Sequence, residues 1–252
     1  MKAKKLLCFI LAGVLMMGAC GCMPNNKVNE NNEIRLTERQ QNILASQGLP
    51  VEYAQLTKRQ QLTITDIEEM LQAVEAKYNR PFAYVDYTAE RVLDSGVLTA
   101  MPVGGTAARD SFTVERVGDN AFRDTYVFLP VRDKYEAAAW EAATAFVDAA
   151  QAKLYSDVLE TDITYEEVAT ADLAGRVEAD SWLFLNESAY RDADLTALSQ
   201  SITGKLASEG LYGSLYIVVV KGDYFAAISQ NGYTKFLADT YVVQRKFAVI
   251  AK

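Results

Sequence analysis

The sequence predicts an α+β protein: capped N-terminal helices, then mainly antiparallel sheet strands interleaved with two further helices. Apolar residues recur at three- and four-residue spacing in some segments, and alternate or cluster over short runs in others. Several strand-like runs also follow one another without an intervening helix, which favours α+β over a strictly alternating α/β order. Half of the 252 residues are apolar, which is enough to bury a sizeable core.

Two capping-box patterns begin the N-terminal helices. Thr37 is followed three residues later by Gln40, and Thr57 by Gln60, so each threonine can exchange hydrogen bonds with its glutamine. The first helix is expected to end near Gly48, and the second to run to about residue 78. The echo is not sustained at a fixed period, which favours a helical hairpin over a repeat protein.

Strands are expected next, at residues 82–87, 97–103, 112–117 and 125–129. The last of these runs is more uniformly apolar than the others, as is typical of a central strand. An alanine-rich helix is then expected from residue 133 to about 156, because its apolar residues form a stripe at helical spacing.

The remaining residues repeat the order of helix and strands. Strands are expected at residues 159–165, 181–185, 215–220 and 241–250, a helix at 192–209, and a turn at 221–223. The helix-then-strands unit thus occurs twice, at about 57–130 and 133–250. The pattern fits either two similar lobes or one continuous sheet.

The leader carries the most specific pattern in the chain. Lys2, Lys4 and Lys5 precede an uncharged apolar run at residues 6–17. As a helix this run would extend about 18 Å, whereas the hydrocarbon core of a bilayer is about 30 Å thick. The leader is therefore typical of a signal peptide rather than of a membrane span.

Gly18 and Ala19 follow the apolar run and immediately precede Cys20. This stretch resembles the lipobox of bacterial lipoproteins, although Met17 stands where leucine is usual. In that family a lipid is attached to the cysteine thiol and a peptidase cuts before the cysteine. The resemblance implies that residues 1–19 are a signal peptide and that Cys20 is the lipidated N-terminus. Cys22 is a second candidate, and ordinary secretion is a third interpretation.

The resemblance also implies where the protein acts. It would be exported and anchored to the bacterial cell membrane by lipid, with its body outside the cytoplasm. Residues 20–33 would comprise the lipidated cysteine and an asparagine-rich tether, and residues 34–252 the globular body. All three cysteines lie in the first 22 residues, so the body has neither disulfides nor a thiol nucleophile.

Composition excludes several function classes. The chain has no histidine, which excludes Ser-His-Asp and Cys-His catalysis and histidine metal sites. The formal net charge is −8, and three of the 25 basic residues lie in the leader, so the mature chain has 22 basic against 33 acidic residues. Nucleic acid is not an expected partner, because a phosphate backbone requires a basic footprint. The Thr203–Lys205 stretch lacks the upstream glycine of a phosphate loop, and no cofactor is expected.

Carboxylates are the one abundant catalytic group that remains. Glycoside hydrolysis needs two of them about 5–10 Å apart, one held protonated by its surroundings. The candidates are Glu115, Glu166, Glu167, Asp180 and Glu187. Solvated surface acids are the simpler interpretation, so no catalytic residue is assigned.

Two further groups of side chains are candidates for binding, one for calcium and one for recognition of a ligand. Asp192 with Asp194, or Asp119 with Asn120 and Asp124, offers oxygen ligands for calcium, but both lack the glycine and closing glutamate of an EF-hand, and no metal site is assigned. Among the tyrosines, a recognition surface is considered beside ordinary sheet packing. The cluster singled out comprises Tyr212, Tyr216, Tyr224 and Tyr233.

The sequence therefore favours a membrane-anchored envelope lipoprotein with a non-enzymatic binding or accessory body. Its expected partners are the membrane, through lipid on the N-terminal cysteine, and an unidentified protein or small molecule. The alternative is a carboxylate-dependent hydrolase acting on envelope glycan. A transport-type solute-binding protein is a third interpretation, although two full lobes usually need a longer chain.

Overall fold

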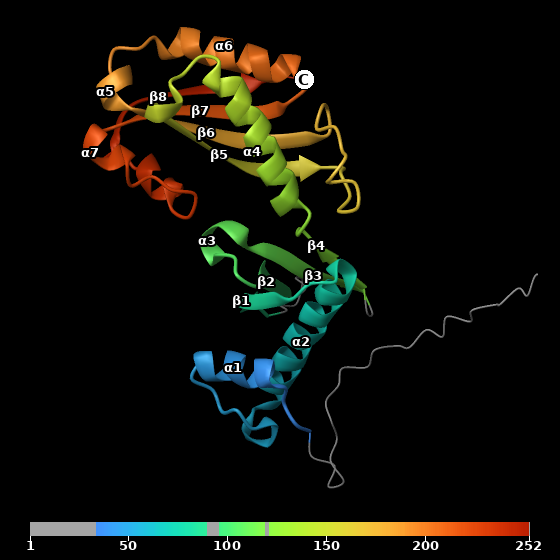
Figure 1. Ribbon diagram of the computed structural model, residues 1–252. Helices are drawn as coiled ribbons and strands as arrows, with labels where there is room; N and C mark the ends of the chain where they lie inside the picture. The colour runs from blue at the N-terminus through green and yellow to red at the C-terminus, as the bar shows by residue number, and fades with distance from the viewer. Residues whose placement is uncertain (1–33, 90–95, 119–120, 252) are drawn as a thin grey trace, which may run out of the picture. The chain divides into compact units, whose positions relative to one another are not determined.

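The protein has an α+β fold in the computed structural model, which describes residues 34–89, 96–118 and 121–251 (Figure 1). Cys20, the rest of the leader and the tether lie outside the described residues. The chain divides into two compact units, one ending at Leu56 and the other beginning at Thr57. In the part of the chain that the structure describes, no helix combines the length and the apolarity that crossing a bilayer requires.

The N-terminal unit contains α1 (Glu38–Ser46) and the short 3-10 helix η1 (Tyr53–Gln55). The predicted capping box is confirmed: Gln40 N–H donates to Thr37 Oγ1 at 3.2 Å, and Thr37 N–H donates to Gln40 Oε1 at 2.8 Å. The helix ends just before Gly48, whose positive φ of 67° suits a glycine after a helix C-terminus.

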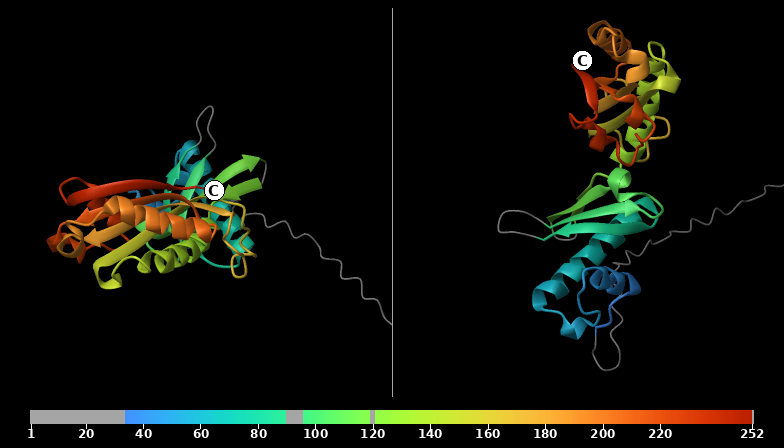
Figure 2. Two further views of the ribbon diagram at one scale, coloured as in Figure 1. Left: turned by 90° about the horizontal axis from the view of Figure 1, so that it is seen from above. Right: turned by 90° about the vertical axis from the view of Figure 1, so that its left-hand side faces the viewer.

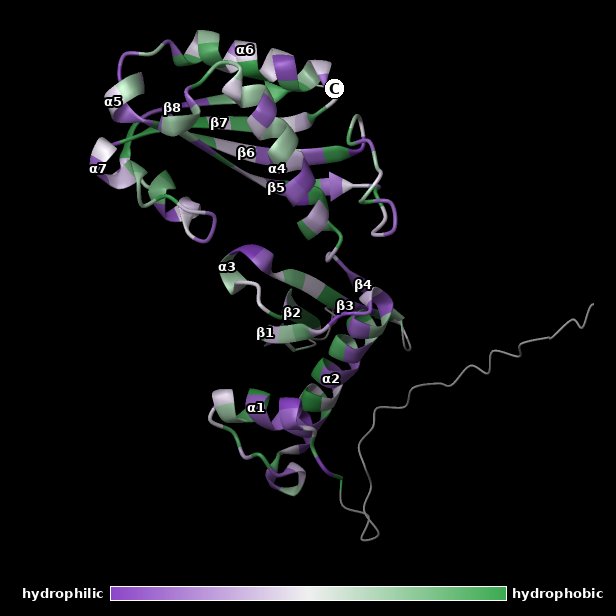
Figure 3. Ribbon diagram, in the orientation of Figure 1, coloured by the Kyte–Doolittle hydropathy of each residue, from purple (hydrophilic) through white to green (hydrophobic). Residues whose placement is uncertain are grey.

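The second unit begins with α2 (Lys58–Tyr78), and its capping box is also confirmed. Gln60 N–H donates to Thr57 Oγ1 at 3.3 Å, and Thr57 N–H donates to Gln60 Oε1 at 2.8 Å. Asn79 ends the helix in the left-handed conformation with φ 49°. Hydrophobic and hydrophilic residues both recur along α2 (Figure 3), and the buried residues Ile64, Ile67, Leu71 and Val74 follow the three- and four-residue spacing of an amphipathic helix.

The first sheet has four antiparallel strands in sequential order. They are β1 (Phe82–Thr88), β2 (Val97–Pro102), β3 (Phe112–Gly118) and β4 (Ala121–Asp124), with α3 (Ala107–Asp110) between β2 and β3. The first three strands lie where the sequence predicts them. Tyr78, Phe82 and Phe112 pack with Tyr126 between α2 and this sheet, with ring centroids 4.6–5.1 Å from that of Tyr126.

The strand expected at residues 125–129 is wrong, because α4 (Phe128–Thr144) begins inside it. Pro130 lies in the first turn of α4, where a missing N–H costs nothing because the first helical N–H groups have no intrahelical acceptor. The helix expected over 133–156 therefore begins earlier and ends earlier than predicted.

The second sheet begins with β5 (Ala152–Thr161), which takes residues that the sequence analysis assigned to that helix. The other strands are β6 (Val177–Asn186), β7 (Tyr212–Val220) and β8 (Val242–Ile250), in the order β5-β6-β7-β8. Only the β6–β7 pair is parallel in this sheet, and α6 (Leu195–Ser208) makes the crossover. The expected turn at 221–223 leads instead into α7 (Gly222–Phe225).

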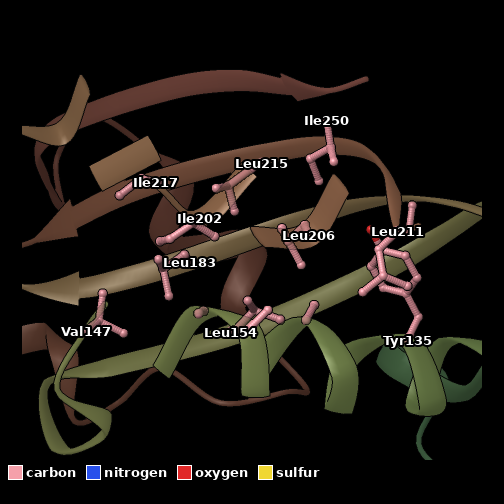
Figure 4. Packing of buried hydrophobic residues seen from close by; sticks show 14 of the residues in the cluster. Tyr135, Val147, Leu154, Leu183, Ile202, Leu206, Leu211, Leu215, Ile217 and Ile250 are labelled. Atoms are coloured by element: carbon pink, nitrogen blue, oxygen red, sulfur yellow. The ribbon is translucent and has the colours of Figure 1, made fainter. Parts of the chain in front are cut away.

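Helices α4 and α6 cover the same face of the second sheet (Figure 2). Their side chains meet those of β5, β6 and β7 in the main core, where Tyr135, Leu154, Leu183, Ile202 and Ile217 are buried (Figure 4). The opposite face is partly covered by the segment between β7 and β8, which includes α7 and the 3-10 helix η3 (Tyr233–Leu237).

Candidate functional site

A pocket of about 440 Å³ lies along the free edge of β5. Because β5 is the first strand of the β5-β6-β7-β8 sheet, its other edge has no partner strand among the described residues. Residues of α3, α4, β5 and the loop after α7 line this pocket, which we call the β5 pocket: Arg109, Asp110, Arg132, Asp133, Glu136, Ala137, Trp140, Ala152, Lys153, Leu154 and Gln230.

The carboxylate of Glu136 is fixed by four hydrogen bonds. Arg109 donates to both of its oxygens, at 3.0 and 3.1 Å, and Gln230 Nε2 donates at 3.2 Å. The N–H of Ser156 in β5 donates to Glu136 Oε2 at 2.7 Å. The Arg109 side chain is 5% exposed and that of Glu136 is 12% exposed, so this is a desolvated ion pair. It joins α3 to α4 and to β5.

A second buried guanidinium, that of Arg132 in α4, holds α3 against α4. Arg132 donates to Asp133 Oδ1 at 3.1 Å, lies 3.4 Å from Asp110 Oδ1, and also donates to the carbonyl oxygen of Arg109. Its side chain is 6% exposed. The β5 pocket is therefore built on rigid elements, with positive and negative side chains in balance around it.

The register of β5 shows which backbone groups enter the pocket. Ser156 lies opposite Ser181 of β6, yet its N–H is directed to Glu136. In an antiparallel edge strand, successive residues direct their N–H and C=O groups alternately to the partner strand and to the free edge. The register is continuous from Ala152 to Val158. Leu154, two residues before Ser156, therefore also points its N–H and C=O to the free edge, where it lines the pocket.

Lys153 forms the wall opposite α4. Its Nζ donates to the carbonyl oxygens of Phe225, Ala226 and Ile228, at 3.0, 3.2 and 2.6 Å. Burial lowers the pKa of Lys153 from its ordinary value, because the charged form loses solvent. The ammonium group thus fixes the loop after α7 against β5 rather than standing free in the pocket.

An aromatic row crosses the face of the second sheet that α4 and α6 leave uncovered. Tyr155, Trp182, Tyr216 and Phe247 are cross-strand neighbours in the register of β5, β6, β7 and β8. Trp182 is stacked on Tyr216 with ring centroids 5.5 Å apart, and Tyr216 lies 5.0 Å from Phe247. Phe247 is 52% exposed, so the row is open to solvent at the β8 end.

The structure brings two of the four singled-out tyrosines together. Tyr216 and Tyr233 both contact Trp182, with ring centroids 5.5 and 5.4 Å away. Tyr233 is buried and donates to Asp157 Oδ2 at 2.6 Å, and burial followed by this hydrogen bond raises its pKa. Tyr224 instead packs on Tyr241, 4.9 Å away. The remaining tyrosine, at position 212, accepts a hydrogen bond through its backbone carbonyl from the Tyr135 hydroxyl at 2.9 Å.

The carboxylates considered for hydrolysis are not gathered in one cleft, and none of them lines the β5 pocket. Glu115 pairs with Arg123, and Glu166 is exposed. The pKa of Glu167 is lowered by the Thr164 N–H and then by Arg176, and the pKa of Glu187 is lowered chiefly by Arg191. Asp180 lies opposite Asp157 in the register of the second sheet.

Two of the oxygen ligands considered for calcium, Asp194 and Asp124, have structural partners, and Asp192 is exposed. Asp194 caps α6, accepting from Thr196 N–H at 2.9 Å and Ala197 N–H at 3.0 Å. Asp124 accepts from Lys77 Nζ at 2.8 Å and from the Tyr78 hydroxyl at 2.7 Å. Asp119 and Asn120 lie outside the described residues. Within the described part of the chain, no group of three or more acidic, cysteine or histidine side chains is placed to hold a metal ion.

The residues that form the β5 pocket are not among the sites predicted from the sequence. Arg109 and Glu136 are 27 residues apart in the chain and carry no motif spacing. Trp182 and Phe247 are also missing from the predicted aromatic cluster. The alternation of side chains along a strand could have predicted that both lie on the same face as Tyr216. Each lies in a predicted strand on the side opposite to the core residues.

Comparison with known proteins gives no family for this chain. No protein-family model matches it, and no curated protein matches it. Among solved structures, a DUF5037 family protein from Ruminococcus gnavus is similar over 65% of this chain and 78% of the other, with 10% sequence identity and a TM-score of 0.38. A similarity this weak transfers neither fold nor function.

Proposed function

We propose that the protein is a membrane-anchored bacterial envelope lipoprotein whose body binds a ligand in the β5 pocket without converting it chemically. The proposal of an anchor rests on the lipobox-like leader that ends at Cys20. The proposal of binding rests on a pocket of about 440 Å³, within the size range of small-molecule sites, lined by a few fixed polar groups.

The single observation that favours binding over hydrolysis is the set of hydrogen bonds that Glu136 makes. It is the least exposed acid of the pocket, and its two oxygens accept hydrogen bonds from Arg109, Gln230 and the Ser156 N–H. A general acid must reach the substrate with its carboxyl group, whereas both oxygens of Glu136 are already engaged by Arg109, Gln230 and the backbone of β5. The lowered pKa values of Glu167 and Glu187 also run against the role of proton donor.

Metabolic labelling with an alkyne fatty acid tests the anchor. We expect the wild-type chain and a Cys22→Ser variant to incorporate the label and to sediment with membranes. A Cys20→Ser variant should lose both properties. Labelling that survives in Cys20→Ser and disappears in Cys22→Ser would move the lipid to the second cysteine, and no labelling in any variant would contradict the anchor.

A thermal-shift screen of the full chain in detergent tests the pocket, with short peptides, glycan fragments and small metabolites as probes. A ligand at 100 times its Kd stabilises the folded state by about 2.7 kcal/mol. Ala137 is an exposed residue of α4 that lines the pocket, so Ala137→Phe should fill the pocket and abolish the shift. Ala145→Phe, at an exposed position just after α4, is the matched control and should keep it. Release of cleaved glycan from any probe would favour the hydrolase instead.

A further inference from the structure

We propose that the ligand of the β5 pocket is a short extended peptide that pairs with the free edge of β5 as an added strand. This inference rests on the proposed binding function and names the class of ligand. Strand addition is a general mode of peptide recognition in which main-chain hydrogen bonds supply affinity and alternate side chains supply specificity.

The backbone of Leu154 carries the proposal. Its side chain is buried in the main core, so the strand is held rigidly. Its N–H and C=O face the free edge, because they alternate with the ladder to β6 and share the direction of the Ser156 N–H. No other described segment of the chain pairs with this N–H or C=O. A peptide residue placed opposite Leu154 would accept from the N–H and donate to the C=O.

Glu136 limits how far such a strand can extend. Because its carboxylate already accepts from the Ser156 N–H, the free edge remains open at Ala152 and Leu154 and is closed at Ser156. Each strand residue spans about 3.3 Å, so the open edge matches a segment of about three residues. The pocket volume of about 440 Å³ is consistent with a ligand of this size.

The two walls of the pocket differ in chemistry. Ala137 and Trp140 of α4 offer apolar surface on one side, and Lys153 and Gln230 offer polar surface on the other. Successive side chains of an added strand point to opposite sides. The pocket therefore selects a peptide with an apolar residue toward Trp140 and polar neighbours, and the balanced charges of its lining give little preference for net charge.

Amide hydrogen exchange tests this geometry directly. The full chain, labelled with 15N-leucine and held in detergent, is titrated with a library of acetylated and amidated tripeptides pooled by their central residue. We expect at least one pool with an apolar central residue to slow exchange of the Leu154 amide tenfold or more. Leu215, in the middle of β7, is the internal control and should not change. N-methylation of the bound tripeptide at its central residue should weaken binding tenfold or more.

The outcomes separate this inference from the proposed function. One outcome is that a tripeptide binds and Ala137→Phe abolishes binding, but the bound peptide does not slow exchange of the Leu154 amide and N-methylation does not weaken binding. That outcome overturns strand addition. If no tripeptide binds while a glycan fragment or metabolite shifts the wild type and not Ala137→Phe, strand addition is again overturned and the binding function stands. If no probe of any class binds, both are overturned.

Discussion

Removing the carboxylate of Glu136 should destabilise the fold strongly. In a Glu136→Ala variant, Arg109 would keep one acidic neighbour, Asp133, at 3.6 Å, and that side chain is 64% exposed. Breaking a desolvated ion pair by removing one partner typically costs about 3–5 kcal/mol. The Ser156 N–H also loses its acceptor, which costs about 1–3 kcal/mol when no water replaces it. The two costs together give about 4–8 kcal/mol, and because the pocket is open to water we expect a loss near the lower end, about 4–5 kcal/mol.

Urea denaturation followed by circular dichroism measures this loss, and a thermal scan should show a drop of about 10 °C, since 1 kcal/mol corresponds to about 2–4 °C in a chain of this size. The companion variant replaces both partners, as Arg109→Met with Glu136→Leu. It should be more stable than Glu136→Ala, because no charge is left buried without a partner. A loss below about 1 kcal/mol in Glu136→Ala, or a double variant that is less stable than the single one, would refute the reasoning.

Three further predictions concern other parts of the fold. Gly213→Ala should destabilise the folded protein by more than about 3 kcal/mol, because Gly213 has φ 126° and an added Cβ would lie 1.9 Å from the Ala179 carbonyl oxygen. Its control is Gly204→Ala in α6, where an added Cβ meets open space, and this variant should be more stable than the wild type by about 0.5–1 kcal/mol in the same urea assay. The pKa of Tyr233 is raised in the folded state, so its contribution to stability is fully present below pH 10, the ordinary pKa of a tyrosine, and is lost as the pH rises further. Above pH 10 the urea midpoint should therefore fall less steeply with pH in Tyr233→Phe than in the wild type. The lowered pKa of Glu167 has the opposite sign: its contribution is present above about pH 4.5 and lost as pH falls, so Glu167→Gln should flatten the acid limb of the stability profile, and an unchanged limb would count against the contacts with Thr164 and Arg176.

Local chemistry made the N-terminal helices predictable. The pairs Thr37–Gln40 and Thr57–Gln60 act over three residues, so the sequence alone contains both partners of each capping box. The strands at 82–88 and 212–220 were equally accessible, because their runs of aromatic and β-branched residues are bounded by turn-forming residues.

The boundaries of α4 were not predictable from periodicity. Tyr126 and the residues after it have the composition of a buried strand, and Leu154 continues the apolar stripe of the helix. Tertiary contacts decide both cases: Tyr126 packs on Tyr78 and Phe82, and Leu154 faces α4 from the neighbouring strand. A short apolar run gives the same signal in a helix and in a strand.

The β5 pocket was even less accessible to sequence reasoning. Its lining comes from α3, α4, β5 and the loop after α7, which are far apart in the chain. Arg109 and Glu136 belong to charged segments that resemble any solvated surface. The direction of the Leu154 N–H follows from the register of β5 on β6, and register depends on the pairing partner.

The contact between Glu136 and the Ser156 N–H has a consequence for the behaviour of the protein at high concentration. An open strand edge is a template on which other chains can pair and aggregate. Glu136 blocks that template partway along β5, and the stretch left open contains two residues whose backbone groups face the free edge, Ala152 and Leu154. At the other edge of the sheet, Arg245 and Lys246 place two charges in the middle of β8. Both edges of the sheet are thus protected against uncontrolled self-association, and the β5 edge retains only a short stretch that another strand can pair with.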